Sequence, residues 1–600
     1  MPIPFKLKHQ QLLAAMAILS ASAVTAAHAE PFKFGVMADT QWTSNDAGNN
    51  PNTVALGIIN QILPRFVDAQ VKFVVQVGDL TDNGSTGGLD TWNVAAQTLY
   101  NNRIGFYPVR GNHEPSAAAA NRFKLNFPQT QGQGVNVAGA INHASPSTPV
   151  GLAGLTYSFD FGNTRFIAVD QYTRTSGSTP AVNSAALDQV SWIGQQLDGK
   201  PADSHGFVFA HKELVGQNHT DVLLGGDPSS NAAQRNALIG AMARNNVRYF
   251  LGGHDHMHHR SIVKSPDGAS TVQNIIHSSD SYKFYVPSVP SKDQVYNPGN
   301  RQEMPIAQEL FTIGYYIFTV DGPRLTVDHY ASDNGCGGTL GAGRDCDLTR
   351  TPALTFAKRE SYGYSLNGKE FIVQPGATFT GIADAAPASG NWGGTRMAIL
   401  DGANSVSTTL YDGRVTIQDV NTGWASRADI DANGAARLKS DALTLWGMEN
   451  AIASEEADVY TLSLSYDANA RGPLAVVARP FNGTAWEQAA GRNFGGGAKF
   501  VVGPWKAGYA LGTYGVDPVT HTAWAVVNRG GEFAVAQSTD GDLNGDGVVD
   551  SRDVALLTQN LNRDAAQLPG ADLDNDGRIT ALDARKLATI CSSANCAVAR

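Results

Sequence analysis

Five short apolar runs in the first half of the chain are each followed at once by side chains that bind metal ions in proteins. The runs are typical of β-strands, and the amphipathic stretches between them have helical spacing, so this half is predicted to be an α/β layered domain. In open α/β sheets, ligands collect at the carboxyl ends of the strands. We therefore expect one metal site there. The runs 34–38, 73–77, 106–109, 207–210 and 249–251 supply the candidates Asp39, Gln41, Asp79, Asp82, Asn112, His113, His211, His254 and His256.

These candidates fall into motifs with fixed spacing. The chain reads Asp-Thr-Gln at 39–41, Gly-Asp-Leu-Thr-Asp at 78–82, Gly-Asn-His-Glu at 111–114, then His211, and Gly-His-Asp-His at 253–256. With these motifs in this order, residues 32–330 resemble the calcineurin-like metallophosphoesterase superfamily. The resemblance implies the family's fold, a β-sandwich flanked by helices, of the α/β (α+β) class.

The resemblance also implies a site for two metal ions, both bridged by Asp79. Asp39, Gln41 and His256 would complete the coordination of one ion, and Asn112, His211 and His254 that of the other. Carboxylate, amide and imidazole ligands suit Mn, Fe or Zn. In such a site a hydroxide that bridges the two metals attacks phosphorus in line. By the same analogy, His113 assists the leaving group and Asp82 orients its ring.

Two positions depart from the family pattern. Gln41 stands where most members have His, and a neutral amide oxygen is a harder and weaker ligand than imidazole. Asn83 stands where protein-phosphatase members have Arg, so a phosphate group has one clamp fewer. Gln41 leaves a rival hypothesis open, in which the chain is a catalytically weakened, phosphoesterase-like cell-surface binding protein attached through its C-terminal module.

Several polar residues near the motifs admit two interpretations. Arg260 and Lys212 are candidate substrate contacts, with a structural arginine and a solvated surface charge as the alternatives. His258 and His259 are expected at the rim of the site rather than as ligands. Residues 282–285, Tyr-Lys-Phe-Tyr, fit either the wall of a substrate cleft or a plain strand.

The N-terminus and the middle of the chain suggest the wider organisation. Lys6 and Lys8 precede an apolar stretch and an Ala-His-Ala site, which is the layout of a signal peptide over 1–29 that is cleaved near Ala29. This predicts a secreted or periplasmic protein, and no stretch is long enough for a transmembrane segment. The phosphoesterase-like domain is placed at 30–350. Residues 351–537, with short β-rich segments between Gly, Asn and Asp, are predicted to be an all-β domain of unknown role.

Two twelve-residue loops repeat near the C-terminus. Each carries side-chain oxygens at positions 1, 3, 5, 9 and 12 around a turn-forming glycine, which is the pattern of a calcium loop. With position 7 contributing its backbone carbonyl, the expected ligands are Asp542, Asn544, Asp546, Val548, Asp550 and Asp553, and then Asp572, Asp574, Asp576, Arg578, Thr580 and Asp583.

The calcium repeats resemble a known module. A single helix-like stretch follows each loop, and residues 540–592 are therefore similar to a type I dockerin, with 593–600 as a tail. The resemblance implies two bound Ca²⁺ ions and a cohesin-like protein partner. Positions 10 and 11 of each loop contact the partner in that family. Here they hold Ser551-Arg552 and Ala581-Leu582, which are not the usual Ser-Thr pairs in both repeats. A calcium-dependent structural end piece is the alternative.

Cysteine spacing and charge narrow the function further. The four cysteines form two close pairs, Cys336 with Cys346 and Cys591 with Cys596, which are expected disulfides in an exported protein. A net charge of −10 argues against nucleic-acid binding, which needs a basic face. The sequence therefore predicts an exported, metal-dependent hydrolase of phosphomonoesters or phosphodiesters that acts on small phosphate-ester molecules.

Overall fold

The structure is a computed structural model of the chain. The residues that it describes are 30–42, 50–147, 150–172, 184–225, 231–285, 303–322, 324–333, 353–366, 372–373, 396–401, 409–411, 414–416, 420–425, 438–440, 442–446, 456–470, 473–480, 485–537, 541–544, 549–568, 570–574, 576–591 and 596–597. The predicted signal peptide and the Cys336–Cys346 pair lie outside these residues. Within them, no helix is long and apolar enough to cross a membrane.

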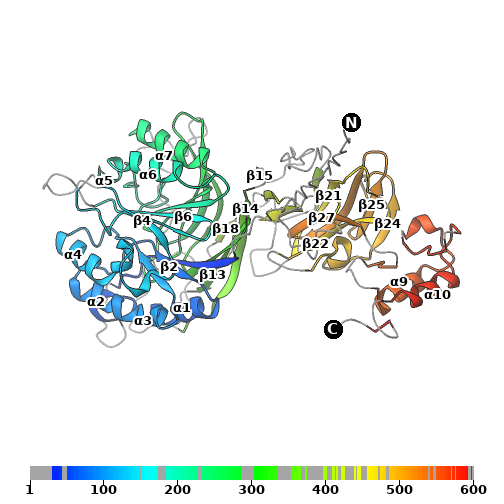
Figure 1. Cartoon of the computed structure of the whole chain (residues 1–600), viewed down its shortest axis with the longest axis horizontal. Helices are drawn as coiled ribbons and strands as arrows, with labels where there is room; N and C mark the ends of the chain where they lie inside the picture. The colour runs from blue at the N-terminus through cyan, green and yellow to red at the C-terminus, as the bar shows by residue number, and fades with distance from the viewer. Residues whose placement is uncertain are drawn as a thin grey trace, which may run out of the picture.

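Two β-sheets form the first domain (Figure 1). In the described part of the chain, one sheet has the strand order β14-β13-β12-β1-β2-β3 and the other the order β17-β18-β11-β9-β10-β8-β7-β6-β5-β4. The strands of the first sheet are β1 (Phe32–Met37), β2 (Phe73–Gln76), β3 (Gly105–Pro108), β12 (Thr312–Asp321), β13 (Arg324–Asp333) and β14 (Ala357–Ser365). Those of the second are β4 (Ile141–Ala144), β5 (Tyr157–Phe161), β6 (Thr164–Val169), β7 (His205–Ala210), β8 (Tyr249–Gly252), β9 (His258–Lys264), β10 (Thr271–Ile276), β11 (Glu303–Glu309), β17 (Thr409–Tyr411) and β18 (Arg414–Thr416).

Aromatic side chains fill the space between the two sheets. Phe34 lies at the centre, with its ring 4.6 Å from that of Phe318 in its own sheet and 5.1 Å from those of Phe166 and Phe207 in the other. Burying rings of this size from both sheets is the main apolar contribution to the sandwich. The sandwich is therefore a closed core, and polar chemistry is left to the ends of its strands.

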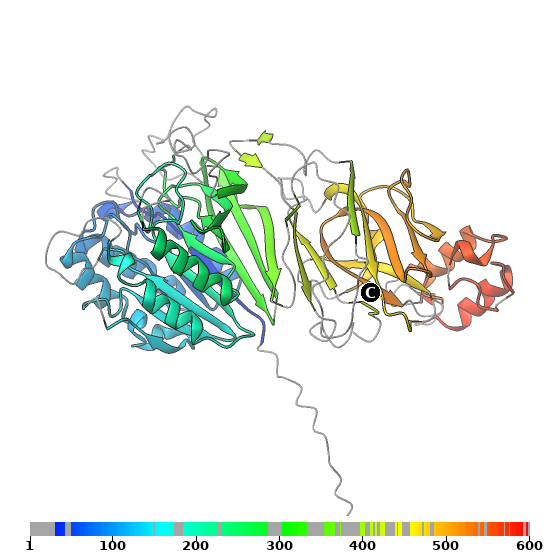
Figure 2. The ribbon, with the colours of Figure 1, turned by 90° about the horizontal axis from the view of Figure 1, so that it is seen from above.

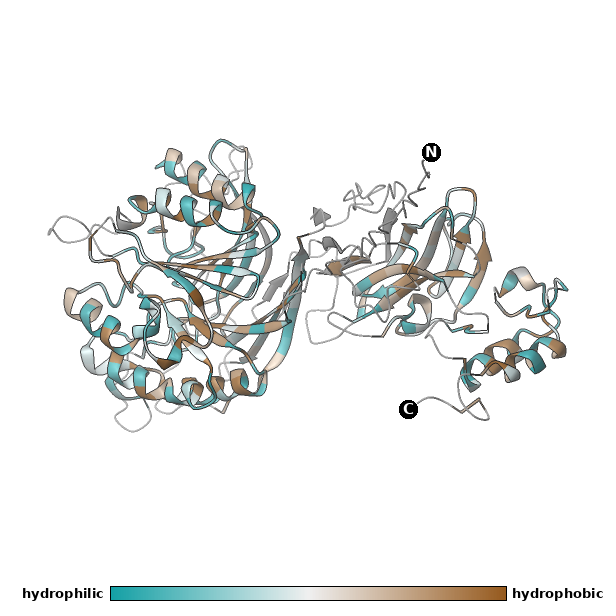
Figure 3. Ribbon diagram, in the orientation of Figure 1, coloured by the Kyte–Doolittle hydropathy of each residue, from teal (hydrophilic) through white to brown (hydrophobic). Residues whose placement is uncertain are grey.

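Helices cover the outer faces of the sandwich. Helix α1 is amphipathic and buries Ile58, Ile62 and Phe66 against the first sheet. Figure 3 shows polar and apolar residues mixed along these helices, as expected where one side faces solvent. The helices are α1 (Leu56–Asp68), α2 (Thr86–Ala95), α3 (Gln97–Tyr100) and α4 (Ala117–Asn126) on the first sheet, and α5 (Ser184–Leu187), α6 (Val190–Asp198) and α7 (Ala232–Arg244) on the second. The predicted β-sandwich flanked by helices is confirmed.

The first domain extends past the boundary expected at residue 350. Strand β14 pairs along its length with β13, and β18 pairs with β11, so segments after 350 complete both sheets. Unpaired edge strands expose backbone donors and acceptors, and pairing with these later strands removes that cost. The short runs after 350 look alike in sequence, and only the pairing distinguishes those that belong to the first domain.

The second domain is all-β, as predicted, and the described strands form two sheets around one apolar core. Glu532 joins it to the first domain, since its carboxylate accepts hydrogen bonds from Arg324 at 2.8 Å and from Arg479 at 2.5 Å. The strands are β15 (Ile372–Val373), β16 (Arg396–Asp401), β19 (Val420–Ala425), β20 (Ala442–Trp446), β21 (Glu456–Ser465), β22 (Leu474–Arg479), β23 (Glu487–Gln488), β24 (Lys499–Val502), β25 (Thr513–Asp517), β26 (Thr522–Arg529) and β27 (Gly531–Gln537).

A small helical module lies at the C-terminal end, beyond the second domain (Figure 2). It contains α9 (Ser551–Gln559) and α10 (Ala581–Thr589). Leu557 and Leu587, one from each helix, are fully buried in one apolar cluster that also contains Ile579. The two repeats of the sequence are therefore packed as a pair rather than as separate loops.

Candidate metal centre and calcium loops

The strand ends bring the predicted ligands to one place. Strands β1 and β2 are parallel neighbours, and their ends are tied by hydrogen bonds from Asp39 N to Gly78 O (3.1 Å) and from Thr40 N to Asp79 O (2.9 Å). The side chains of Asp39, Asp79 and His211 are buried and each offers a ligand atom within 4.8 Å of the others. His211 comes from the second sheet, so the centre lies where the two sheets meet.

His211 presents its Nε2 atom to the centre. Its Nδ1 donates to the carbonyl of Val77 at 3.0 Å, which leaves Nε2 to face Asp79 Oδ1 at 3.3 Å and Asn112 Oδ1 at 2.8 Å. Burial opposes a charge on His211, but the carboxylates of Asp79 and Asp39 outweigh it and raise the pKa to about 9. The surroundings of this nitrogen therefore favour a cation.

Gln41 occupies the other side of Asp79. Its Nε2 lies 3.1 Å from Asp79 Oδ2 and 3.1 Å from His256 Nε2. His256 donates from Nδ1 to the carbonyl of Lys283 at 2.8 Å, which aims Nε2 inward, 3.6 Å from Asp39 Oδ1. The Gln41 Oε1 atom is a buried acceptor with no hydrogen-bond partner among the described residues. A buried orphan oxygen is costly, and turning the amide over would bring this oxygen to face Asp79 and His256, where a metal ion would satisfy it.

His254 has a partner that the sequence did not predict. Its Nε2 lies 3.2 Å from Asp221 Oδ1, and its ring stacks on that of His219 at 4.1 Å. Its backbone N–H donates to both carboxylate oxygens of Asp39 at 3.1 Å. Burial lowers the pKa of His254 to about 4, so its imidazole is neutral and can serve as a ligand. Asp221 and His219 lie on an irregular segment with no motif that could have revealed them.

The backbone at four expected ligands is strained. Asp39, Asp79, His254 and His256 have φ values of 52°, 53°, 71° and 53°, the left-handed region that non-glycine residues rarely adopt. Strain of this kind costs about 1–3 kcal/mol per residue and concentrates at functional sites. Gly111 is required for a different reason, since a Cβ atom there would lie 1.9 Å from Asp79 Oδ1.

His113 lies at the edge of the centre, with its side chain 21% exposed. Its Nε2 is 3.6 Å from Asp79 Oδ2, and its backbone N–H donates to Asp79 Oδ1 at 3.1 Å. Its Nδ1 contacts the backbone carbonyl of Asp82, while the Asp82 carboxylate is 3.6 Å away. The sequence assigned the orienting role to the Asp82 side chain, and the structure places the backbone oxygen closer.

Glu114 binds the two motif loops together. Its buried carboxylate accepts from Thr81 N at 2.8 Å and from Gly111 N at 3.0 Å. Burial and the nearby charge of Asp79 raise the pKa of Glu114 to about 7. The fourth residue of the Gly-Asn-His-Glu motif thus acts by positioning the other three.

The two C-terminal loops are closed by the same hydrogen bonds. Asp553 accepts from Leu543 N (2.7 Å) and Asp550 N (2.8 Å), and Asp583 accepts from Leu573 N (2.7 Å) and Thr580 N (2.7 Å). Each loop runs into its helix through a capping box. Asp572, Asp574 and Asp576 each offer an oxygen within 4.8 Å of the others. Asp546 and Val548 lie outside the described residues.

Two segments of the chain match known families. Residues 32–258 match the family described as calcineurin-like phosphoesterase. The first domain is a calcineurin-like phosphoesterase domain. Residues 540–589 match the type I dockerin domain, so the C-terminal module is a dockerin. No curated protein matches the chain.

Solved structures similar to the chain include two phosphatases. Purple acid phosphatase PPD1 from yellow lupin (Lupinus luteus) seeds has 13% identity and a TM-score of 0.35, with 56% of this chain and 54% of the lupin chain covered. A dimetal phosphatase from Danio rerio has 17% identity and a TM-score of 0.31, with 50% of this chain and 95% of the other covered. The chain thus spans about half the length of the lupin enzyme.

The residues after the last phosphoesterase motif are interior residues. Arg260, a candidate substrate contact, is buried, bonds Glu360 at 2.6 Å and stacks on Tyr362 at 4.0 Å, so it has the structural role. His258 and His259, expected at the rim, are also buried and bond Glu360 (2.8 Å) and Glu303 (2.9 Å). These residues form the first part of β9, where the side chains are buried.

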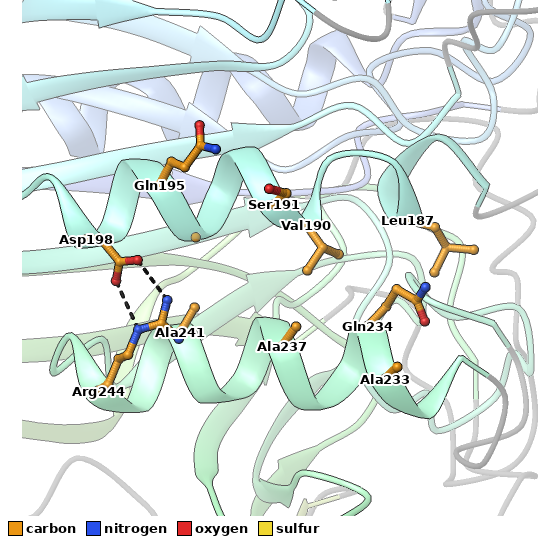
Figure 4. Close-up of a pocket in the computed structure, with 11 residues that line it drawn as sticks. Leu187, Val190, Ser191, Gln195, Asp198, Ala233, Gln234, Ala237, Ala241 and Arg244 are labelled. Carbon is orange, nitrogen blue, oxygen red and sulfur yellow. Dashed lines mark hydrogen bonds and ion pairs between the residues drawn. The ribbon is translucent and has the colours of Figure 1, made fainter.

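The Lys212 side chain is also unavailable to a substrate. The Lys212 side chain is 1% exposed and forms an ion pair with Asp221, so it is neither a solvated charge nor free for a phosphate. A groove runs between α6 and α7, lined by Val190, Ala237 and Ala241 and closed by the Asp198–Arg244 ion pair (Figure 4). It contains none of the expected metal ligands.

In the dockerin, Cys591 and Cys596 form the predicted disulfide.

Proposed function

We propose that the chain is an exported, metal-dependent phosphoesterase that hydrolyses phosphomonoesters or phosphodiesters. One observation carries the proposal: the Asp79 carboxylate faces a different ligand set with each oxygen. Oδ1 lies 3.3 Å from His211 Nε2, and Oδ2 lies 3.1 Å from Gln41 Nε2. Each oxygen of this one carboxylate thus contacts a residue expected to ligate a different ion, and a carboxylate so placed could bridge a pair of cations.

Two bound cations would supply the Lewis acidity that activates water and neutralises phosphate oxygens. Asp39, Gln41 and His256 would hold one of them, and Asn112, His211 and His254 the other. The mixed carboxylate, amide and imidazole donors suit Mn, Fe or Zn. The orphan Gln41 Oε1 supports this assignment, because an amide oxygen in that position is available as a ligand.

His113 would give a proton to the leaving oxygen. It is partly exposed and 3.6 Å from Asp79, so it lies beside the metal pair rather than among the ligands. Its Nδ1 is held by the Asp82 carbonyl, which fixes Nδ1–H and turns Nε2 toward the centre. General acid help of this kind contributes about 10²–10⁴-fold to a rate.

The signal-peptide pattern and the dockerin support a role outside the cytoplasm. Calcium would fold the dockerin, and a cohesin-like protein would be its partner. Leu582, at a partner-reading position, is 55% exposed, whereas the Arg552 side chain turns back onto Asp550 at 2.7 Å. The two repeats thus offer different surfaces, and the second offers the apolar one.

The test is a panel of phosphomonoesters and phosphodiesters assayed with defined Mn, Fe or Zn loading. We expect hydrolysis by the wild type, loss of both metal and activity in Asp79→Asn, and a loss of turnover with metal retained in His113→Asn. Asp198→Asn, on the α6–α7 surface, is the matched control and should behave as wild type. A metal-loaded wild type inactive on the whole panel would overturn the proposal in favour of a binding protein.

A further inference from the structure

The segment after β10 is fastened to the metal centre at several points. Asp280 Oδ2 accepts from the backbone N–H of Ala38 at 3.1 Å, next to the ligand Asp39. On the other side, the ligand His256 donates from Nδ1 to the carbonyl of Lys283 at 2.8 Å, with the Ser279 hydroxyl 3.2 Å away. The Lys283 side chain therefore starts from a backbone position that the centre itself fixes.

Lys283 differs from the other cations found near the centre. Lys212 is 1% exposed and paired with Asp221, and Arg260 is buried against Glu360. The Lys283 side chain is partly exposed, and its ammonium interacts first with the Tyr285 hydroxyl and then, electrostatically, with the carboxylates of Asp79 and Asp82. It therefore combines access to solvent with attraction toward the centre, which a substrate-binding cation needs.

Aromatic rings shape the space beside this ammonium. Lys283 Nζ lies 5.6 Å from the ring centroid of Tyr285, whose ring packs edge-on against His256 at 5.0 Å and His219 at 4.7 Å. His219 in turn stacks on His254. The rings of Tyr285 and His219, which pack on the ligands His256 and His254, limit the positions that the long Lys283 side chain can adopt. They therefore keep its charge near the metal centre.

We propose that Lys283 binds a non-bridging oxygen of the substrate phosphate and makes the centre prefer dianionic phosphomonoesters over monoanionic diesters. The inference rests on the proposed function. Asn83 cannot provide a cationic clamp because its side chain is neutral, and its Oδ1 accepts from Ser85 N at 3.0 Å within an exposed turn. Lys283, on the segment after β10, would supply the positive charge that this position lacks. A phosphomonoester carries nearly two charges at neutral pH and a diester carries one, so an ammonium favours the monoester.

The test compares Lys283→Met, Lys283→Arg and wild type, all loaded with Mn, on p-nitrophenyl phosphate and bis(p-nitrophenyl) phosphate. Loss of one charge-assisted contact should lower kcat/KM for the monoester about tenfold or more in Lys283→Met, chiefly through KM. The diester value should change less than threefold. Lys283→Arg should recover most of the monoester activity, and metal content should stay at the wild-type level. Lys72→Met, at an exposed position on the first sheet, is the control.

The failure of this inference is distinguishable from failure of the proposed function. If the wild type hydrolyses neither ester, the proposed function fails. If the wild type is active and Lys283→Met lowers both esters equally, or lowers neither, Lys283 does not read substrate charge and the inference is overturned. Loss of metal in both Lys283 variants would also overturn it, because the side chain would then support the ligands instead.

Discussion

The Nε2 atom of His211 lies 2.8 Å from Oδ1 of Asn112 in the amide orientation of the structure. His211 donates from Nδ1 to Val77 O, so Nε2 and the Asn112 oxygen can share only a positively charged group between them. Without metal that group is a proton, since the carboxylates of Asp79 and Asp39 raise the pKa of His211 to about 9, and a bound metal ion would take its place. The geometry of the protein alone therefore favours a positive ion at this point.

Removing that ion should destabilise the phosphoesterase domain. Ligand at 100 times its Kd stabilises the folded state by about 2.7 kcal/mol, which corresponds to several degrees in Tm for a domain of this size. We expect EDTA to lower Tm by several degrees and Mn to restore it. Adding Ca²⁺ back to the EDTA-treated chain before Mn separates this effect from calcium loss in the dockerin. Asn112→Leu should flatten the response to Mn, and an equal response in that variant would contradict the shared-cation argument.

Gln41 should be a working ligand and not a sign of lost function. Gln41→Leu keeps most of the volume but removes the buried oxygen, so we expect metal affinity to fall about tenfold or more, since even outer-shell partners contribute that much. Gln41→His should bind at least as tightly as wild type. Metal per chain after dialysis measures both. Gln97→Leu, on the exposed face of α3, is the control, and a Gln41→Leu protein with full metal content would show that Gln41 is not a ligand.

The metal ligands were predictable because each follows a strand. A buried strand has a recognisable apolar run, and parallel neighbours deliver the residues after them to one edge, so Asp39 and Asp79 could be placed together from the strand pattern. His211 follows a strand of the other sheet, and its place beside them was implied by the family resemblance. Asp221 and His219 could not be predicted. They lie on an irregular segment, and only tertiary contacts bring them onto His254.

The pairing of strands that lie far apart in the chain could not be predicted from sequence patterns either. The short strand β18 joins β11 although the two lie about a hundred residues apart, and a run of three residues carries too little periodicity to name its partner. The role of Arg260 was left open for a similar reason. Its place after the last motif allowed either a phosphate contact or a structural role, and Glu360, which arrives on β14 from beyond the expected boundary, neutralises it in the interior.

The position-12 aspartates should each control one calcium ion. Asp583 accepts three backbone N–H groups that close the second loop, from Leu573, Asp574 and Thr580. Asp583→Ala should remove both a ligand and this closure, so calorimetry on the full chain should fall from two calcium ions to one. Asp553→Ala should do the same for the first loop, and the double variant should bind none there. Arg585→Ala, exposed on α10, is the control. Two ions bound to Asp583→Ala would contradict the assignment.

Acid should weaken the first domain through His205, which connects its two sheets. His205 Nε2 donates to Gly322 O at 2.8 Å, and its Nδ1 accepts from the Tyr364 hydroxyl on β14 at 3.0 Å. Burial lowers the pKa of His205 from 6.5 to about 4, so between these values the unfolded chain binds a proton that the folded chain does not. Its contribution is therefore complete above pH 6.5 and is lost as the pH falls toward 4.

The size of this loss is about 2 kcal/mol of unfolding free energy between pH 7 and pH 5. His205→Gln cannot titrate, and its amide can donate to the same carbonyl. We expect the variant to be less stable than wild type at pH 7 but to lose about 2 kcal/mol less on going to pH 5. Denaturant unfolding of the metal-loaded chain at both pH values measures the difference, and because both proteins share every other titrating group, the comparison isolates His205. Equal pH dependence in the two proteins would mean that folding does not lower the pKa of His205.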